Sequence, residues 1–188
     1  VSSLVQRAAA SQKRINEFLL KEEKVINEGK SSIKNISSLV FKNVQFNYSN
    51  KGDFLINDLS FTLKSGESLG IFGATGSGKS TLANLICRLY EISKGEYLIN
   101  NHNINDIELN SFRNLIGYVP QDVFLFSDTI TNNIAFGLDD GDFTDQEVKD
   151  AAVNAGIYDE ISKFKDGLNT KIGERGVTLS GGQKQRIA

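Results

Sequence analysis

The segment F-G-A-T-G-S-G-K-S-T-L, residues 72–82, places three glycines, a lysine and several hydroxyl side chains between an apolar run and an apolar-periodic segment. Residues 73–80 fit the phosphate-binding pattern G-x-x-x-x-G-K-[ST]. Glycines allow consecutive backbone N–H groups to turn toward one anion at torsions that a Cβ disfavours. The helix expected from about Lys79 adds free N–H groups and the positive end of its dipole. This segment therefore predicts the nucleotide cradle of an α/β fold of the P-loop NTPase type.

Each polar side chain of the cradle has an expected task. Lys79 reaches the β- and γ-phosphates, Ser80 offers a hydroxyl ligand to Mg²⁺, and Thr81 hydrogen-bonds the α-phosphate. The remaining cradle positions are Gly73, Ala74, Thr75, Gly76, Ser77 and Gly78. The alternative is a glycine-rich turn without a ligand, but the apolar run before the loop and the amphipathic segment after it favour nucleotide binding. The pattern alone does not separate kinases, GTPases and motor ATPases.

Composition sets outer limits on the protein class. The chain has 188 residues, enough for one domain with a proper core, and its net charge of -2 gives no reason to expect nucleic acid. The single Cys87 cannot form an internal disulfide, which favours a reducing compartment. We find no apolar run of about 18 residues and no signal peptide. Because the chain lacks methionine and ends on the helix-like Q-K-Q-R-I-A, we expect a fragment of a longer protein.

Hydrophobic periodicity predicts how the chain is organised. Residues 1–29 show a three- and four-residue spacing typical of a helix, with Gly29 as its stop, and residues 29–38 are polar and small, typical of a linker. Strands are predicted at 39–48, where apolar residues fall on even positions, and at 55–63, 68–72, 97–99 and 115–119.

Local signals place turns and helix starts in the rest of the chain. Asn100-Asn101 suits a tight turn, Asp128 is expected to cap a short helix, and Thr144 and Glu147 have the spacing of a capping box. A group of acidic residues has no metal-ligand spacing and is interpreted as a solvated loop: Asp139, Asp140, Asp142 and Asp145. The whole pattern favours an α/β core that carries a helical subdomain.

A second motif, L-S-G-G-Q at residues 179–183, has the chemistry of another anion trap. It combines the Ser180 hydroxyl, the backbone N–H groups of Gly181 and Gly182, and a helix start at about Gln183. The alternative is a capped helix entry after a glycine turn. Two such anion traps in one small domain cannot both bind the same triphosphate, unless the second trap belongs to a neighbouring copy of the chain.

Together these segments resemble the nucleotide-binding domain of ATP-binding cassette (ABC) transporters from about Leu39 to the end. Residues 179–183 resemble the family signature, which the resemblance places in trans: Leu179, Ser180, Gly181, Gly182 and Gln183. The resemblance implies ATP and Mg²⁺ as ligands, Tyr48 as the ring that stacks on adenine, and Leu55 as a further nucleotide contact. It also implies that Gln121 contacts Mg²⁺ and the attacking water and that it faces the membrane domain. Without the resemblance, Tyr48 is equally well interpreted as a core aromatic.

Further matches point to the exporters of this family. Gly173-Glu174-Arg175-Gly176 resembles the loop that exporters place against their transmembrane coupling helices, and residues 9–19 resemble the segment after the last membrane helix. The resemblance thus implies a linker helix and loop at 1–37, part of an ATPase domain at 38–188 and a helical subdomain at about 124–180. It implies a homodimer at the cytoplasmic face of a membrane, with membrane and ATPase domains on one polypeptide, that exports a substrate.

The family also has catalytic residues that do not occur among residues 1–188. In the family, a Walker B Asp, a catalytic Glu and a switch His follow the signature, whereas His102 lies in an Asn-rich turn and is given no catalytic role. We therefore expect ATP hydrolysis from the intact parent and not from these residues alone. We also expect the excised chain to be unstable, because a central parallel strand would be absent.

Two other function classes remain as alternatives. One is a soluble cassette ATPase of the DNA-repair, chromosome-structure or ribosome-associated type, and the linker helix, the G-E-R-G loop and the lack of a basic face weigh against it. The other is a nucleotide-binding module without turnover, which would have a degenerate cradle or signature. Neither motif is degenerate here.

Overall fold

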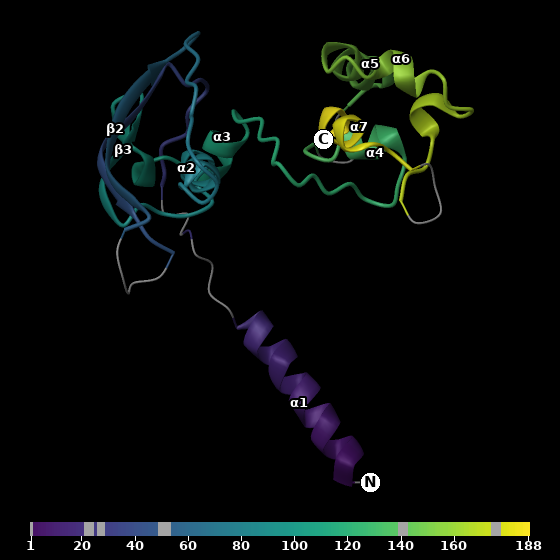
Figure 1. Cartoon of the computed structure of the whole chain (residues 1–188), viewed down its shortest axis with the longest axis horizontal. Helices are drawn as coiled ribbons and strands as arrows, with labels where there is room; N and C mark the ends of the chain where they lie inside the picture. The colour runs from purple at the N-terminus through teal and green to yellow at the C-terminus, as the bar shows by residue number, and fades with distance from the viewer. Residues whose placement is uncertain (1, 21–24, 26–28, 49–53, 139–142, 174–177) are drawn as a thin grey trace. The chain divides into compact units, whose positions relative to one another are not determined.

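The chain folds into two compact units, Val1–Gly117 and Tyr118–Ala188. The computed structural model describes residues 2–20, 25, 29–48, 54–138, 143–173 and 178–188 (Figure 1), and each unit is described by itself. Within these residues, no helix combines the length and the apolar character needed to cross a bilayer.

The first unit is built on an antiparallel sheet of four strands in the order β2-β1-β3-β4. The strands are β1 (Ser38–Phe46), β2 (Ile56–Lys64), β3 (Lys94–Ile99) and β4 (His102–Asn103). The predicted turn at Asn100-Asn101 joins β3 to β4, and both residues have positive φ, 52° and 64°. This turn is confirmed, because asparagine tolerates the left-handed region that a tight hairpin needs.

A β-bulge in β1 changes which of its residues face the core. Leu39 and Phe41 are buried before the bulge, whereas Val44 and Phe46 are buried after it. Asn43 has φ 48° at this irregularity. An extra residue shifts the two-residue period by one, so the predicted even-position burial is right only for the second half of the strand.

The core of the first unit lies between the sheet and two helices, α2 (Lys79–Ile86) and α3 (Leu109–Arg113), which Figure 1 shows beside the sheet. Phe41 contacts Tyr97 edge to face, with ring centroids 4.5 Å apart. Other buried members come from α2, from the 3-10 turn η1 (Ile104–Asp106) and the residue after it, and from α3: Leu82, Leu85, Ile104, Ile107 and Phe112. This packing fixes α2, and with it the glycine loop that precedes α2.

The predicted strands at 68–72 and 115–119 are wrong for this structure, which pairs neither segment with a strand among the described residues. Leu69, Ile71 and Phe72 are 45%, 40% and 95% exposed. A strand exists only where a neighbour completes its hydrogen-bond ladder, and an apolar run predicts burial but supplies no partner.

The first helix, α1, spans Ser2–Leu19 and is shorter than predicted. Its described side chains, from Val5 onward, are exposed. Gly29 does not end this helix. It lies instead against the backbone of Ile107, where an added Cβ would stand 2.1 Å from the carbonyl oxygen. Glycine is required at this position because of that close approach.

The predicted linker at 29–38 is bound along the first unit. The Ser31 N–H donates to the Asp106 carbonyl at 3.0 Å, and the Ile33 N–H donates to the Ser111 hydroxyl at 3.2 Å. Ile33 and Ile36 pack against the core. The segment is thus docked on the first unit through its backbone and hydroxyl groups. Composition alone does not distinguish such a docked segment from a free linker.

The second unit is helical, with the elements α4 (Ile130–Ile134), α5 (Asp145–Asn154), α6 (Tyr158–Ile161), η2 (Gly167–Asn169) and α7 (Gly181–Ile187). Among its described residues, one cluster of buried side chains forms the core: Ile130, Ala152, Ile157, Ile161, Ile172, Leu179 and Ile187. An isolated bridge between Thr129 and Lys171 holds the start of α4 to the segment before the signature.

Helix caps test the predicted starts of α4 and α5. The capping box of Thr144 and Glu147 is confirmed at α5. Thr129, and not Asp128, is the N-cap of α4, because its hydroxyl accepts from the Asn132 N–H at 3.1 Å. Asp128 instead accepts from the Thr129 N–H at 2.7 Å, which supports the cap residue.

Candidate functional site

The glycine loop of residues 73–78 precedes α2 and is largely exposed. Gly76 and Gly78 have φ of 83° and 90°, and Gly78 is the N-cap of α2. A Cβ on Gly73 would lie 2.5 Å from the Ser77 hydroxyl oxygen. Gly76 and Gly78 are therefore needed for their torsions, whereas a side chain at Gly73 would displace the Ser77 side chain.

The Lys79 ammonium group lies over this loop. It donates to the carbonyl oxygens of Gly73 and Ala74, each at 2.8 Å. An ammonium group carries three N–H donors, so one remains for a further acceptor. Ser80 is exposed in the first turn of α2. The loop therefore presents a positive charge and an exposed hydroxyl at the N-terminus of α2, as an anion site requires.

Tyr48 lies at the end of β1 and contacts the first turn of α2. Its hydroxyl is 3.0 Å from the hydroxyl oxygen of Thr81, and either atom can be the donor. The Tyr48 ring is 49% exposed, whereas the Thr81 side chain is buried. Tyr48 is thus a partly exposed aromatic beside the cradle rather than a core residue.

Leu55 lies beside the glycine loop in the first unit. A pocket of about 280 Å³ is lined by Leu55, Ile71 and Phe72 together with Ser77, Gly78 and Lys79. Leu55 is 41% exposed, and its N–H donates to the Phe46 carbonyl at 2.9 Å. The structure therefore brings together Tyr48, Leu55 and the cradle residues around one end of α2.

The signature residues begin α7 in the second unit. Ser180 is the N-cap, and its hydroxyl accepts from the Gln183 N–H at 3.3 Å while the Gln183 side chain accepts from the Ser180 N–H at 2.8 Å. Added Cβ atoms on Gly181 and Gly182 would meet nothing within 4 Å, so both glycines face open space. The accepted bond leaves the Ser180 hydroxyl proton free to donate outward. Leu179 is buried in the core, so only its backbone is available to a ligand.

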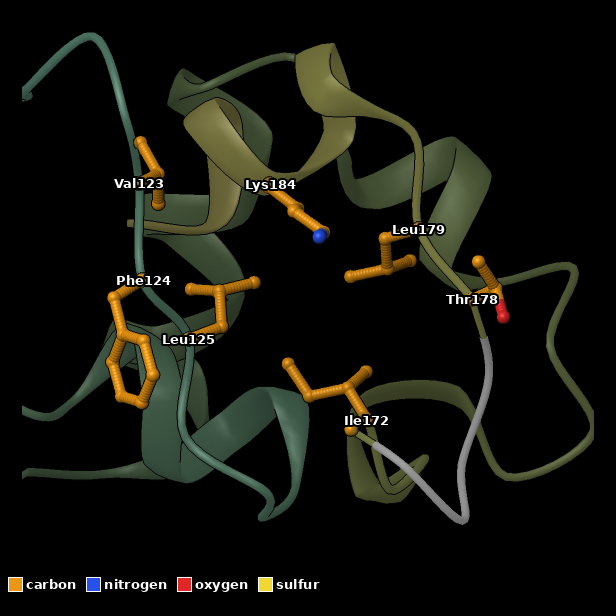
Figure 2. A pocket seen from close by; sticks show the side chains of 8 residues that line it. Val123, Phe124, Leu125, Ile172, Thr178, Leu179 and Lys184 are labelled. Carbon is orange, nitrogen blue, oxygen red and sulfur yellow. The ribbon is translucent and has the colours of Figure 1, made fainter.

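Gln121 also lies in the second unit and is exposed. Its carbonyl oxygen accepts from the Gln185 side-chain amide at 3.3 Å, which links the Gln121 segment to α7. A pocket of about 290 Å³ lies next to this segment. Figure 2 shows Val123, Phe124 and Leu125 on one side of it and Lys184 reaching into it. Glu174, Arg175 and Gly176 lie outside the described residues.

Exposed aromatic rings form a feature that the sequence analysis did not single out. Phe126 stacks on Phe136 with ring centroids 4.3 Å apart and meets Phe124 edge to face at 5.1 Å. The three rings are 42%, 66% and 75% exposed for Phe126, Phe136 and Phe124. The run F-L-F at 124–126 is the sequence pattern that could have predicted this feature, because two phenylalanines two residues apart in an extended segment lie on the same face.

Metal-binding and reactive side chains are scarce in the described part of the chain. No group of three or more His, Cys, Asp and Glu residues is placed to hold a metal there, and Asp139–Asp142 of the predicted acidic loop lie outside it. Burial raises the pKa of the Cys87 thiol, which the positive charge of Arg113 opposes. The thiol is therefore a packed, protonated group.

Comparisons with known proteins agree with this geometry. The family profile described as ABC transporter matches residues 56–188. ABC transporter B family member 6 of Dictyostelium discoideum is 41% identical over 160 residues, which cover 81% of this chain and 23% of that protein. The ATP-dependent lipid A-core flippase of Yersinia pestis is 38% identical over 190 residues, which cover 100% of this chain and 32% of the flippase.

A solved structure extends the similarity to three dimensions. A bacterial Atm1-family ABC exporter with ATP bound matches with a TM-score of 0.82 and 35% identity, over 97% of this chain and 32% of the exporter. The α/β class, with a P-loop NTPase core, an antiparallel β-subdomain and a helical subdomain, is thereby confirmed. The chain spans about a quarter to a third of the length of these relatives.

Proposed function

Because this chain belongs to the ABC transporter family, as the family profile and exporter relatives show, we propose that it binds ATP with Mg²⁺ and drives export across a membrane as part of an intact transporter. The observation that carries the proposal is the glycine loop with the Lys79 ammonium group held over it by the carbonyl oxygens of Gly73 and Ala74. A phosphate chain fits this loop because its backbone is held open by glycines and its cation has a donor to spare.

The first unit supplies most of the proposed nucleotide site. Tyr48 stacks on the adenine, Leu55 contacts the nucleotide, Lys79 binds the β- and γ-phosphates, and Thr81 binds the α-phosphate. Backbone N–H groups of the loop bind phosphate oxygens at Gly73, Ala74, Thr75, Gly76, Ser77 and Gly78. Ser80 would hold Mg²⁺, which when bound neutralises charge on the β- and γ-phosphates. The hydroxyl of Ser80 is a hard oxygen donor of the kind Mg²⁺ prefers.

The second unit supplies the other half of a site on a partner copy. Ser180 donates its hydroxyl proton, and Gly181 and Gly182 offer backbone N–H groups, to the γ-phosphate bound by the partner's loop. Donors from two copies then surround one charged group, so ATP favours a closed head-to-tail dimer and phosphate release favours opening. Gln183 contributes through the capping box that orients Ser180.

The same unit carries the proposed contact with a transmembrane domain on the same polypeptide. Gln121 lies close in sequence to the exposed rings of Phe124 and Phe126, and Phe124 lines the pocket of Figure 2. An exposed aromatic patch beside a pocket is typical of a protein interface. We assign this surface, with the 174–176 region, to the membrane domain, residues 1–37 to the linker, and 38–188 to the ATPase domain at the cytoplasmic face.

The proposal is tested by nucleotide binding to the full chain. Lys79→Ala is expected to lower the affinity for MgATP by at least about tenfold, because a charge-assisted bond to phosphate is lost. Lys64→Ala is the matched control, since Lys64 is an exposed lysine at the end of β2 in the same unit. Equal affinity in both variants would contradict the assignment of the loop as the phosphate site.

A further inference from the structure

Three aromatic rings meet where β1 ends, beside the cradle. The Tyr48 ring contacts Phe46 at a centroid distance of 4.9 Å and an interplanar angle of 83°. It contacts Tyr90 at 5.0 Å and 85°. Phe46 is buried, Tyr90 is half-buried and Tyr48 is half exposed. The two less exposed rings therefore hold the exposed one at near-perpendicular angles, the arrangement that aromatic pairs prefer.

The Tyr48 ring is also held through its hydroxyl. That group bonds Thr81, which lies in the first turn of α2 beside Lys79 and Ser80 of the cradle. Three contacts, two with rings and one with a hydroxyl, thus act on a single side chain. A ring that is already held loses less conformational freedom when a ligand stacks on it.

Tyr90 reaches this position because of how the chain leaves α2. Arg88 follows the helix with φ 51°, and its buried guanidinium donates to the Ile107 carbonyl at 3.1 Å. The Leu89 N–H donates to the Asn84 carbonyl at 2.9 Å. These bonds turn the chain back toward the end of β1, so that α2 carries cradle residues at its start and Tyr90 just beyond its end.

We infer that Tyr90 is a positioning residue for the nucleobase: it holds the Tyr48 ring in the orientation that stacks on adenine, while the Tyr48–Thr81 bond ties that ring to the phosphate cradle. The inference rests on the proposed function, because it requires Tyr48 to stack on the base. In this inference Tyr90 acts on the ligand through Tyr48. Its removal should therefore weaken the base-dependent part of binding and leave the phosphate-dependent part unchanged.

The test compares two ligands on the full chain, MgATP and magnesium tripolyphosphate, by titration calorimetry. Tripolyphosphate engages the cradle without a base, so the ratio of the two affinities reports the contribution of the base. Tyr90→Ala is expected to weaken MgATP binding about threefold to tenfold, the loss of one aromatic pair, and to leave tripolyphosphate binding unchanged. Tyr90→Phe keeps the ring and should keep the affinity ratio of the unmodified chain.

Tyr48→Ala separates failure of the inference from failure of the proposed function. If Tyr48→Ala leaves the affinity ratio unchanged, the adenine assignment of Tyr48 is wrong, and the role of Tyr90 falls with it. If Tyr48→Ala lowers the ratio and Tyr90→Ala does not, only the positioning role is overturned. An equal loss of affinity for both ligands in Tyr90→Ala would also overturn it, because that result describes a disturbed cradle.

Discussion

Asn100 fastens the docked segment 29–38 to the sheet, and its removal gives a prediction whose size follows from the structure. Its side-chain oxygen accepts from the Ser37 N–H and hydroxyl, both at 2.8 Å, and from the Ser38 N–H at 3.2 Å. Its side-chain N–H₂ donates to the Asn35 carbonyl at 2.9 Å. Most of these groups are exposed, so each bond contributes about 0.5 kcal/mol, the low end of the usual range, and the four together about 2 kcal/mol.

Asn100→Ala also places an alanine at positive φ, which costs about 1 kcal/mol and must be separated from the hydrogen bonds. Asn101→Ala is the matched control, since Asn101 has a φ of 64° and its side chain makes no hydrogen bond within the described residues. We expect the free energy of unfolding to fall by about 3 kcal/mol for Asn100→Ala and about 1 kcal/mol for Asn101→Ala.

The assay is urea unfolding of the full chain, combined with hydrogen exchange at the amides of Ser37 and Ser38. The expected difference of about 2 kcal/mol corresponds to roughly 30-fold faster exchange of these amides in Asn100→Ala than in Asn101→Ala. Equal unfolding free energies and equal exchange in the two variants would refute the reasoning. The segment that joins α1 to the sheet would then not be held by Asn100.

Three further predictions concern the cradle, the aromatic link and the cap of α5. Gly73→Ala should weaken MgATP binding about tenfold, because the added Cβ would overlap the Ser77 hydroxyl. Gly137→Ala is the control and should leave the affinity unchanged, because an added Cβ there meets open space. Equal affinities in the two variants would contradict this explanation. In a double-mutant cycle, Tyr48→Phe and Thr81→Val should show a coupling of about 0.5–1.5 kcal/mol in unfolding free energy, and additivity would mean that their hydroxyls do not interact. Hydrogen bonds from the backbone and side chain of Thr144 lower the pKa of Glu147, so the carboxylate stabilises α5 fully above the ordinary value of 4.5. That stabilisation is lost as the pH falls through the lowered folded pKa, so amide exchange in α5 should rise at acid pH in the unmodified chain and not in Glu147→Gln, and identical pH profiles would disprove the link.

Local sequence signals predicted those parts of the fold that depend on neighbours along the chain. The glycine pattern located the loop and the start of α2, the Thr-x-x-Glu spacing located the cap of α5, and Asn100-Asn101 located a turn, because a few adjacent residues determine each of them. Tyr48, Leu55 and the cradle were assigned from motifs and family resemblance, and the structure brings them together in the first unit.

Features that depend on distant partners were not accessible in the same way. The runs at 68–72 and 115–119 are apolar and strand-like, yet a ladder depends on a partner that composition does not reveal. Gly29 had the spacing of a helix stop, whereas its close approach to Ile107 is a contact between residues far apart in the sequence. Tyr90 carried no motif, because its role follows from how the chain turns after α2.

The central claim is that each glycine loop is half of a site, completed by Ser180–Gln183 of a partner. Its most direct test is the mass of the full chain by light scattering, with and without MgATP, in Ser180→Arg and in the control Ser65→Arg, which alters an exposed turn. We expect Ser65→Arg to dimerise with ATP, and Ser180→Arg to bind ATP with normal affinity yet stay monomeric, because the larger side chain blocks the facing phosphate. Normal ATP-dependent dimerisation of Ser180→Arg would contradict the account.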